Sequence, residues 1–185
     1  MHEIKILFFV LGSFFAVEDS RIFAEKTTVT IYPKEQRIQI LQETLFTFIK
    51  TEEDEELSLS QWSNLKNEDG LAEHWAEELD ECTSKQLEIK ETSAGGRTTI
   101  QSVITVTYSE EKELEAMGIW YDTEKNQFSL NHNPDNNIKT SSGKLDGNYW
   151  YFDVDSVVTF SVEPFLNLPD DYMESLVTLE KLLRR

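Results

Sequence analysis

Residues 149–163 restrict what this chain can fold into more than any other segment, because apolar and polar side chains alternate along them. The apolar positions are Trp150, Phe152, Val154, Val158, Phe160 and Val162. The positions of opposite parity hold Tyr149, Tyr151, Asp153, Asp155, Thr159, Ser161 and Glu163. Successive side chains of a strand point to opposite faces, so the segment predicts a sheet with one buried and one open face. The pair Asp155-Ser156 interrupts the pattern and predicts either one bent strand or two.

Shorter alternating segments elsewhere are separated by turn residues and predict hairpins. A glycine pair between two alternating runs is a strong hairpin signal, because both residues of a tight hairpin turn adopt positive φ. The expected hairpins cover 27–48, 87–108 and 119–130, with turns at 33–36, at Gly95-Gly96 and at 123–126. Residues 132–145, rich in Asn, Ser, Pro and Gly, are expected to form a long loop.

Helices are predicted in three places. Helical spacing links Trp62, Leu65, Leu71, Trp75 and Leu79, with Ser58 or Ser60 as the expected cap and an interruption near 67–70. A short helix is expected over 109–117, closed by Gly118, and a longer one over 169–183. Residues 52–56 are five consecutive acids, and their mutual repulsion favours a solvated loop.

Together these elements predict an α+β fold. We expect a mostly antiparallel sheet of about seven strands, built from hairpins and covered on one face by helices. A β-sandwich with peripheral helices is the alternative, because its inner faces would show the same alternation. Residues 25–185 have the length of a single domain.

Residues 1–24 are similar in pattern to a secretory leader. Lys5 precedes an uncharged run from Ile6 to Val17, and Phe23-Ala24 lies where a peptidase could cut. The run is too short to span a bilayer, so no stable membrane span is expected after the leader is removed. The pattern predicts a secreted or periplasmic protein.

The formal net charge of −18 (17 Lys and Arg against 35 Asp and Glu) restricts the partners. Such an acidic surface repels phosphates, so nucleic-acid binding is not expected. The acidic surface favours solubility, cation binding or a basic partner. Cys82 is the only cysteine, so the chain forms no internal disulfide, and we expect Cys82 to be a buried thiol.

No catalytic residues, metal site or cofactor are predicted, because the expected signatures are missing or incomplete. The chain lacks a nucleophile elbow, a phosphate-binding glycine loop and a dinucleotide fingerprint. His74 and Glu78 are four residues apart, but no further His or Cys cluster completes a zinc site. The loop 131–137 has oxygen side chains at alternating positions. However, Asn136 replaces the glycine of a calcium loop and Ser142 replaces its bidentate glutamate.

The candidate binding residues are Tyr149, Tyr151, Asp153 and Asp155. If Trp150 and the apolar residues at alternate positions face the core, these four side chains lie together on the opposite face. Aromatic rings beside carboxylates suit a sugar or a peptide that carries basic groups. Alternatively, a helix or loop covers this face. The same two options hold for the neighbouring pair Trp120-Tyr121.

Three functions follow from these observations. The first is an exported, non-enzymatic binding or interaction protein of the cell envelope, whose protein, peptide or sugar ligand the sequence does not name. The alternative is an acidic inhibitor or immunity-type protein that neutralises a basic partner through residues 52–56. A hydrolase that uses paired carboxylates is the third.

Overall fold

The computed structural model describes residues 4–66 and 74–185. Within these residues it contains 10 strands in two antiparallel sheets, together with helices, so the α+β prediction is confirmed. The prediction of about seven strands in one sheet was wrong. The extra strands come from a segment expected to be loop, from one expected to be helix and from the division of 149–163 into two strands, and a second, smaller sheet separates from the first.

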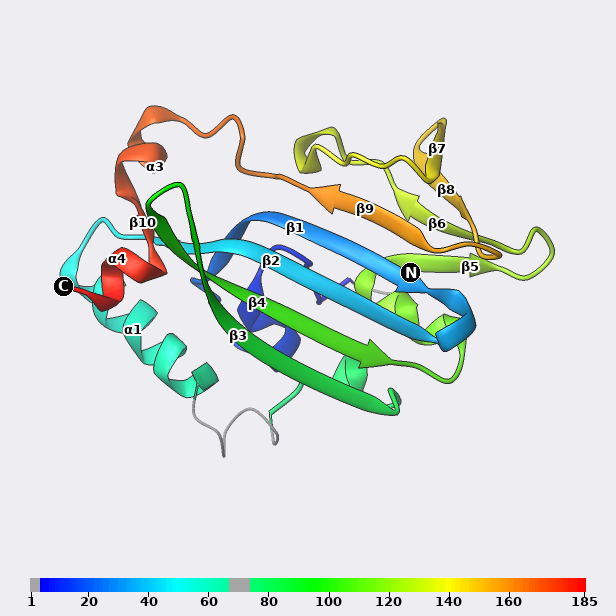
Figure 1. The fold of residues 1–185 in the computed structure, drawn as a ribbon, viewed down its shortest axis with the longest axis horizontal. Helices are drawn as coiled ribbons and strands as arrows, with labels where there is room; N and C mark the ends of the chain where they lie inside the picture. The colour runs from blue at the N-terminus through cyan, green and yellow to red at the C-terminus, as the bar shows by residue number, and fades with distance from the viewer. Residues whose placement is uncertain (1–3, 67–73) are drawn as a thin grey trace.

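The larger sheet has the order β3-β4-β2-β1-β9, and β10 pairs with the far end of β2 (Figure 1). Its strands are β1 (Phe23–Tyr32), β2 (Arg37–Phe48), β3 (Ser84–Ala94), β4 (Arg97–Thr107), β9 (Val158–Val162) and β10 (Leu176–Thr178). Two predicted hairpins, β1–β2 and β3–β4, form most of it. Gly95 and Gly96 have φ values of 60° and 76°, which the tight turn between β3 and β4 requires.

The smaller sheet has the order β5-β6-β8-β7 and lies beside β9 (Figure 1). Its strands are β5 (Ile119–Asp122), β6 (Gln127–Asn131), β7 (Gly143–Asp146) and β8 (Tyr149–Asp153). The alternating segment 149–163 therefore forms two strands, one in each sheet, because the turn at 153–156 redirects the chain. The loop expected over 132–145 contains β7 and a short 3-10 helix, η5 (Pro134–Asn136).

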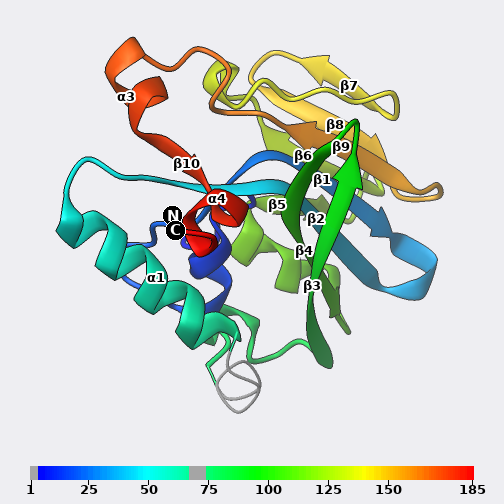
Figure 2. The same ribbon diagram turned by 60° about the vertical axis from the view of Figure 1, so that its left-hand side comes forward.

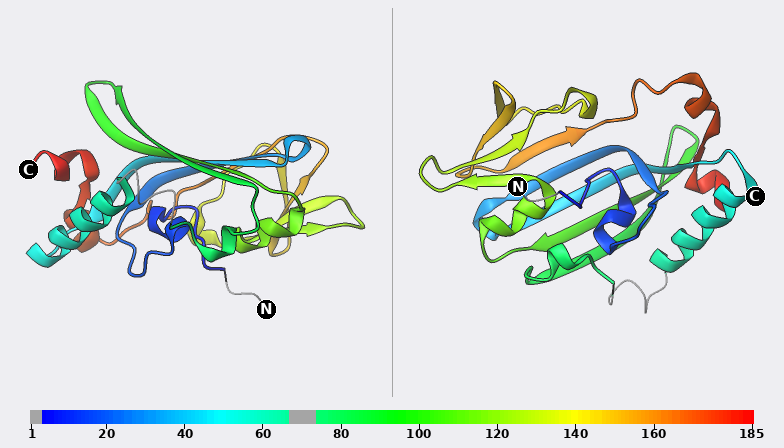
Figure 3. Two further views of the ribbon diagram at one scale, coloured as in Figure 1. Left: turned by 90° about the horizontal axis from the view of Figure 1, so that it is seen from below. Right: turned by 180° about the vertical axis from the view of Figure 1, so that it is seen from behind.

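The inner face of the larger sheet is mostly apolar and is buried along β1, β2, β4 and β9, while β3 has no fully buried residue. The buried side chains of this face include Val29, Ile31, Ile38, Ile40, Ile104, Val106 and Phe160. The N-terminal segment and the 3-10 helices η3 (Glu77–Leu79) and η4 (Glu111–Met117) lie against this face, as both views in Figure 3 show. Gly118 ends η4 with a φ of 78°, as the sequence predicted.

The N-terminal segment, residues 4–24, supplies part of this core. Its buried side chains are Ile6, Phe8, Val10, Leu11, Phe14, Phe15, Ile22 and Ala24. The segment contains the 3-10 helix η1 (Leu11–Phe15) and folds back on the start of β1, with backbone hydrogen bonds from Leu11 to Ile22 (3.1 Å) and from Ala24 to Phe9 (3.0 Å). The fold in Figure 1 is thus that of the uncut chain, while removal of the segment as a leader stays a prediction.

A buried polar network fixes this segment to the sheet. The side-chain amide of Gln42 donates to the backbone carbonyl of Phe8 at 2.6 Å, and its oxygen accepts from the Ser102 hydroxyl at 2.7 Å. Thr27 also donates to the Phe8 carbonyl, at 3.4 Å. All three polar side chains have no exposed surface. A buried carbonyl needs such partners, so Gln42 determines where Phe8 sits.

Residues 52–56 do not form the expected loop, because they begin helix α1 (Glu52–Lys66). Thr51 and Asp54 form a reciprocal cap: the Asp54 amide donates to the Thr51 hydroxyl at 3.2 Å, and the Asp54 carboxylate accepts from the Thr51 amide at 3.0 Å. Acidic side chains also favour the positive end of the helix dipole. Ser58, an expected cap, lies buried inside the helix and hydrogen-bonds Thr47 of β2 at 2.9 Å.

We expect Asp54→Asn to destabilise the protein at neutral pH and to lose this effect in acid. Hydrogen bonds from the Lys50 backbone and from Arg21 lower the pKa of Asp54 to about 2. A lowered folded-state pKa gives stability that is present above the unfolded value, near 3.8, and is lost as the pH falls toward 2. Urea unfolding of both proteins between pH 7 and pH 2 measures the difference. A difference that stayed constant over this range would contradict the prediction.

The C-terminal region is not the single helix predicted over 169–183. It forms α3 (Asp170–Ser175), β10 and α4 (Leu179–Leu183), of which α4 lies beside α1 (Figure 2). Strand β2 pairs with β4 only as far as Gln42, which leaves the edge at residues 46–48 open, and β10 pairs with this edge. The unpaired backbone groups of an edge explain why a strand replaces the middle of the expected helix. The predicted helix interruption near 67–70, with Leu71, lies outside the described residues.

Candidate binding face on the small sheet

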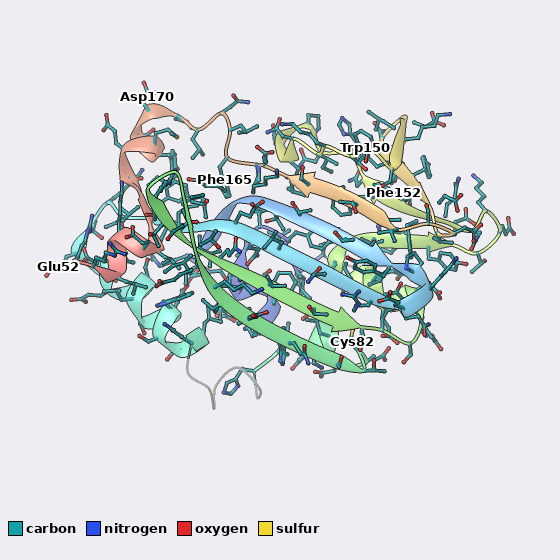
Figure 4. The ribbon with its side chains drawn as sticks, in the orientation of Figure 1. Glu52, Cys82, Trp150, Phe152, Phe165 and Asp170 are labelled. Carbon is teal, nitrogen blue, oxygen red and sulfur yellow. The ribbon has the colours of Figure 1, made fainter. Side chains whose placement is uncertain are left out.

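Strand β8 positions the predicted tyrosines by simple alternation. Trp150 and Phe152, labelled in Figure 4, point to the inner side, where Phe152 is 2% exposed and packs on Phe160 with ring centroids 5.7 Å apart. Tyr149 is 43% exposed and Tyr151 is half-buried on the other side. Their ring centroids lie 6.2 Å apart. Among the described residues, no helix or strand packs on this outer face.

The strand register brings a third aromatic side chain to the same face. Trp120 of β5 pairs with Ser129 of β6, and Ser129 pairs with Tyr151 of β8. Residues directly opposite one another in antiparallel strands share a face, so Trp120 lies in line with Tyr151. Tyr121 points the other way and packs against Phe128, with centroids 5.7 Å apart. The open question about Trp120-Tyr121 is therefore answered by the register of the β5–β6 hairpin.

The outer face of the small sheet encloses a hollow of about 350 Å³. Its lining consists of Trp120, Asp122, Lys125, Gln127, Ser129, Tyr149 and Tyr151. The volume lies at the lower end of the range for small-molecule pockets. Of these residues, the sequence predicted only the two tyrosines as ligand contacts. The others could be found only from the pairing of β5 with β6, because they are distant from Tyr149 along the chain.

The two predicted carboxylates lie at the border of the face. Asp153 ends β8, is exposed, and accepts a hydrogen bond from the Asp155 backbone amide at 2.9 Å. Asp155 belongs to the turn between the sheets rather than to a strand, and it accepts from the Asn126 side chain at 3.2 Å. The carboxylate that lines the hollow is Asp122. The four predicted residues thus do not form one row, because the chain turns before Asp155.

Neither candidate metal site has metal-binding geometry. In residues 4–66 and 74–185, no three His, Cys, Asp or Glu side chains are grouped to hold an ion. His74 and Glu78 do not share an α-helix, since only a 3-10 turn begins after Ala76, and Glu78 pairs with Lys5 at 3.3 Å.

In the loop 131–137, polar side chains form hydrogen bonds with backbone groups. Asn133 accepts from the Asp135 amide at 3.0 Å, and Asn137 donates to the Glu163 carbonyl at 2.9 Å. Such bonds stabilise the turn itself. The neighbouring His132 accepts a hydrogen bond from the Trp150 indole at 3.3 Å. These residues support the small sheet from its inner side.

A larger hollow, of about 630 Å³, lies between the N-terminal segment and η3. Four of its lining residues are acidic: Glu18, Asp19, Glu77 and Glu78. Lys5 also lines this hollow and pairs with Glu78 at 3.3 Å.

Cys82 lies buried near η3, as expected. Burial raises the pKa of its thiol to about 11, with a further contribution from the Glu113 carboxylate. A thiol with a raised pKa forms little thiolate at neutral pH, and the thiolate is the reactive species. Burial and the raised pKa favour a core side chain over a nucleophile.

Among the described residues, no helix combines the length and the apolar character needed to cross a bilayer. No protein-family model matches the chain, and no curated protein sequence or solved structure shows significant similarity to it.

Proposed function

We propose that this is a non-enzymatic binding protein whose contact surface is the outer face of the small sheet. One observation carries the proposal: Trp120, Tyr149 and Tyr151 surround a hollow at the surface. Aromatic side chains dominate the energetics of protein interfaces and ligand sites, because each offers a large contact area at a small entropic cost. Paired strands hold the rings, so little further ordering is required when a ligand binds.

We expect the double substitution Tyr149→Ala and Tyr151→Ala to remove binding without unfolding the protein. The matched control is Tyr172→Ala, since Tyr172 is as exposed as Tyr149 (both 43%) but lies in α3, outside the small sheet. Immobilised wild type and variants are incubated with an envelope extract of the source cells, and bound protein and carbohydrate are quantified. The proposal requires at least an approximately tenfold loss for the double variant alone. Equal binding by all three proteins, with matching thermal midpoints, would reject this surface.

Export to the envelope or beyond is also proposed, and the sequence pattern of residues 1–24 supports it. A segment with eight buried side chains has the packing expected of a permanent part of the domain. The intact mass of the protein purified from its native cells distinguishes a cleaved leader from a retained N-terminal segment. A mature N-terminus at Glu25 supports cleavage and export, and a retained segment counts against it.

The second candidate is an acidic protein that neutralises a basic partner. It is supported by the net charge of −18 and by the exposed Glu52, Glu53 and Glu56 on α1. Asp54 and Glu55 are less available, because they pair with Arg21 (2.8 Å) and Arg185 (2.9 Å). This function predicts an association rate that falls steeply with salt.

A further inference from the structure

We propose that the hollow on the small sheet binds a neutral sugar ring. The inference rests on the proposed function, because it names the ligand class of the same face. A sugar presents apolar C–H faces and a rim of hydroxyl groups. The hollow offers both counterparts: three aromatic side chains, and a polar set made of Asp122, Gln127 and Ser129 together with Lys125.

Most of the polar groups that face the hollow are not used by the fold; the exception is the Asp122 carboxylate, which accepts from the backbone amides of Glu124 and Lys125 at 3.0 and 3.2 Å. In residues 4–66 and 74–185, no hydrogen bond joins the side chain of Gln127, Ser129, Tyr149 or Tyr151, or the indole nitrogen of Trp120, to another protein group. Side chains that point elsewhere in the same sheet are paired: the Tyr121 hydroxyl donates to Asn126 at 2.9 Å, and the Trp150 indole donates to His132 at 3.3 Å. The unused donors and acceptors thus concentrate where a ligand with many hydroxyl groups would need them.

The charge of the hollow matches a neutral ligand. Its charged lining residues are one carboxylate, Asp122, and one ammonium group, Lys125, so they carry no net charge. Around the hollow, Lys144 and Asp146 of β7 pair with Tyr151 and Tyr149, and Asp153 ends β8, so charges of both signs border it. The Lys125 ammonium group repels an arginine or lysine side chain of a partner peptide, and the Asp122 carboxylate repels an anionic ligand. A neutral, polar ring avoids both penalties.

The location of the hollow also suits a ring of this kind. The Trp120–Ser129–Tyr151 row places a small hydroxyl residue between two large rings, which leaves a depression between them. A sugar face can pack on one or both rings, while its hydroxyl groups reach Gln127 and Asp122 at the border.

The test titrates the full-length protein with neutral hexasaccharides of β-1,4-linked glucose, β-1,3-linked glucose and β-1,4-linked N-acetylglucosamine, with calorimetry as the readout. A nona-arginine peptide and a hexamer of galacturonic acid are the charged comparisons. We expect at least one neutral sugar to bind with little dependence on salt. Tyr151→Ala should weaken this binding about tenfold, Tyr151→Phe much less, and the control Tyr172→Ala not at all.

The outcomes separate the sugar from the binding face. If the arginine peptide binds instead, in a salt-dependent manner that Tyr149→Ala plus Tyr151→Ala abolishes, the sugar assignment is wrong and the proposed function stands. If no neutral sugar binds but capture from the extract still depends on both tyrosines, the sugar assignment is again wrong. If neither the sugars nor the extract depend on these residues, both proposals fail.

Discussion

A chain that begins at Glu25 is expected not to adopt the fold described here, so cleavage after Ala24 and this fold are alternatives. It would lack seven large buried side chains of the N-terminal segment: Ile6, Phe8, Val10, Leu11, Phe14, Phe15 and Ile22. Burial of each contributes about 1.5–3 kcal/mol, so the loss reaches or exceeds a typical total stability of about 5–15 kcal/mol. Near-ultraviolet circular dichroism and urea unfolding measure the result. A shortened chain with the native signal and a cooperative transition at the wild-type midpoint would refute this role of the segment.

A single substitution within the segment provides a graded version of the experiment. Phe14 has no exposed surface, so Phe14→Ala should lower the free energy of unfolding by about 3–5 kcal/mol. Leu7 belongs to the same segment but is 43% exposed, and Leu7→Ala should cost less than about 0.5 kcal/mol. Equal effects of the two substitutions would mean that the segment does not pack as described. This comparison is informative even if the shortened chain cannot be purified.

Gln42→Glu is expected to have the second large effect, of about 2–5 kcal/mol at pH 7. The substitution keeps the shape of the side chain, but an ionised carboxylate cannot donate to the Phe8 carbonyl and lies in a site with no exposed surface. Buried groups left without partners, and buried unpaired charges, carry penalties of this size. Chemical unfolding at neutral pH measures the loss.

The pH dependence of the Gln42→Glu variant distinguishes a buried charge from a simple packing defect. Burial raises the folded-state pKa of such a carboxyl above its unfolded value of about 4.3, so part of the lost stability should return as the pH falls through the folded-state pKa. Gln39→Glu is the matched control, because Gln39 lies on the same strand but is only half-buried on the opposite face. A loss in Gln42→Glu that does not change between pH 7 and pH 5 would argue against the hydrogen bond to Phe8.

The strands were predictable from the sequence wherever one face is buried and the other is open. The β1–β2, β3–β4 and β5–β6 hairpins were predicted, because alternation and turn chemistry act over a few residues. The acid run 52–56 misled the prediction, since its repulsion is offset by a Thr51–Asp54 cap that the sequence also contains. A search for the capping pair would have found the helix.

The residues of the candidate site also divide into those that the sequence predicted and those that only the strand pairing revealed. That Tyr149 and Tyr151 share the face opposite Trp150 and Phe152 followed from parity, which needs only the local pattern, but whether that face is open did not. Assigning Trp120, Gln127 and Asp122 to the same face required knowledge of the register of three strands. Excluding Asp155 required knowledge of where the chain turns after β8. Contacts between segments distant in sequence leave no local pattern, so these residues could not be assigned in advance.

By itself, the sequence determined the α+β class, the main hairpins and which residues of a strand share a face, because each depends on interactions between near neighbours along the chain. Only the tertiary structure decided that the strands divide into two sheets, that β10 fills the open edge of β2, and that eight side chains of residues 4–24 pack in the core. An uncharged apolar run has the same local pattern in a cleaved leader and in a segment that packs on the inner face of a sheet. The partner that removes it from water lies elsewhere in the chain, and here that partner is the sheet to which Gln42 holds Phe8.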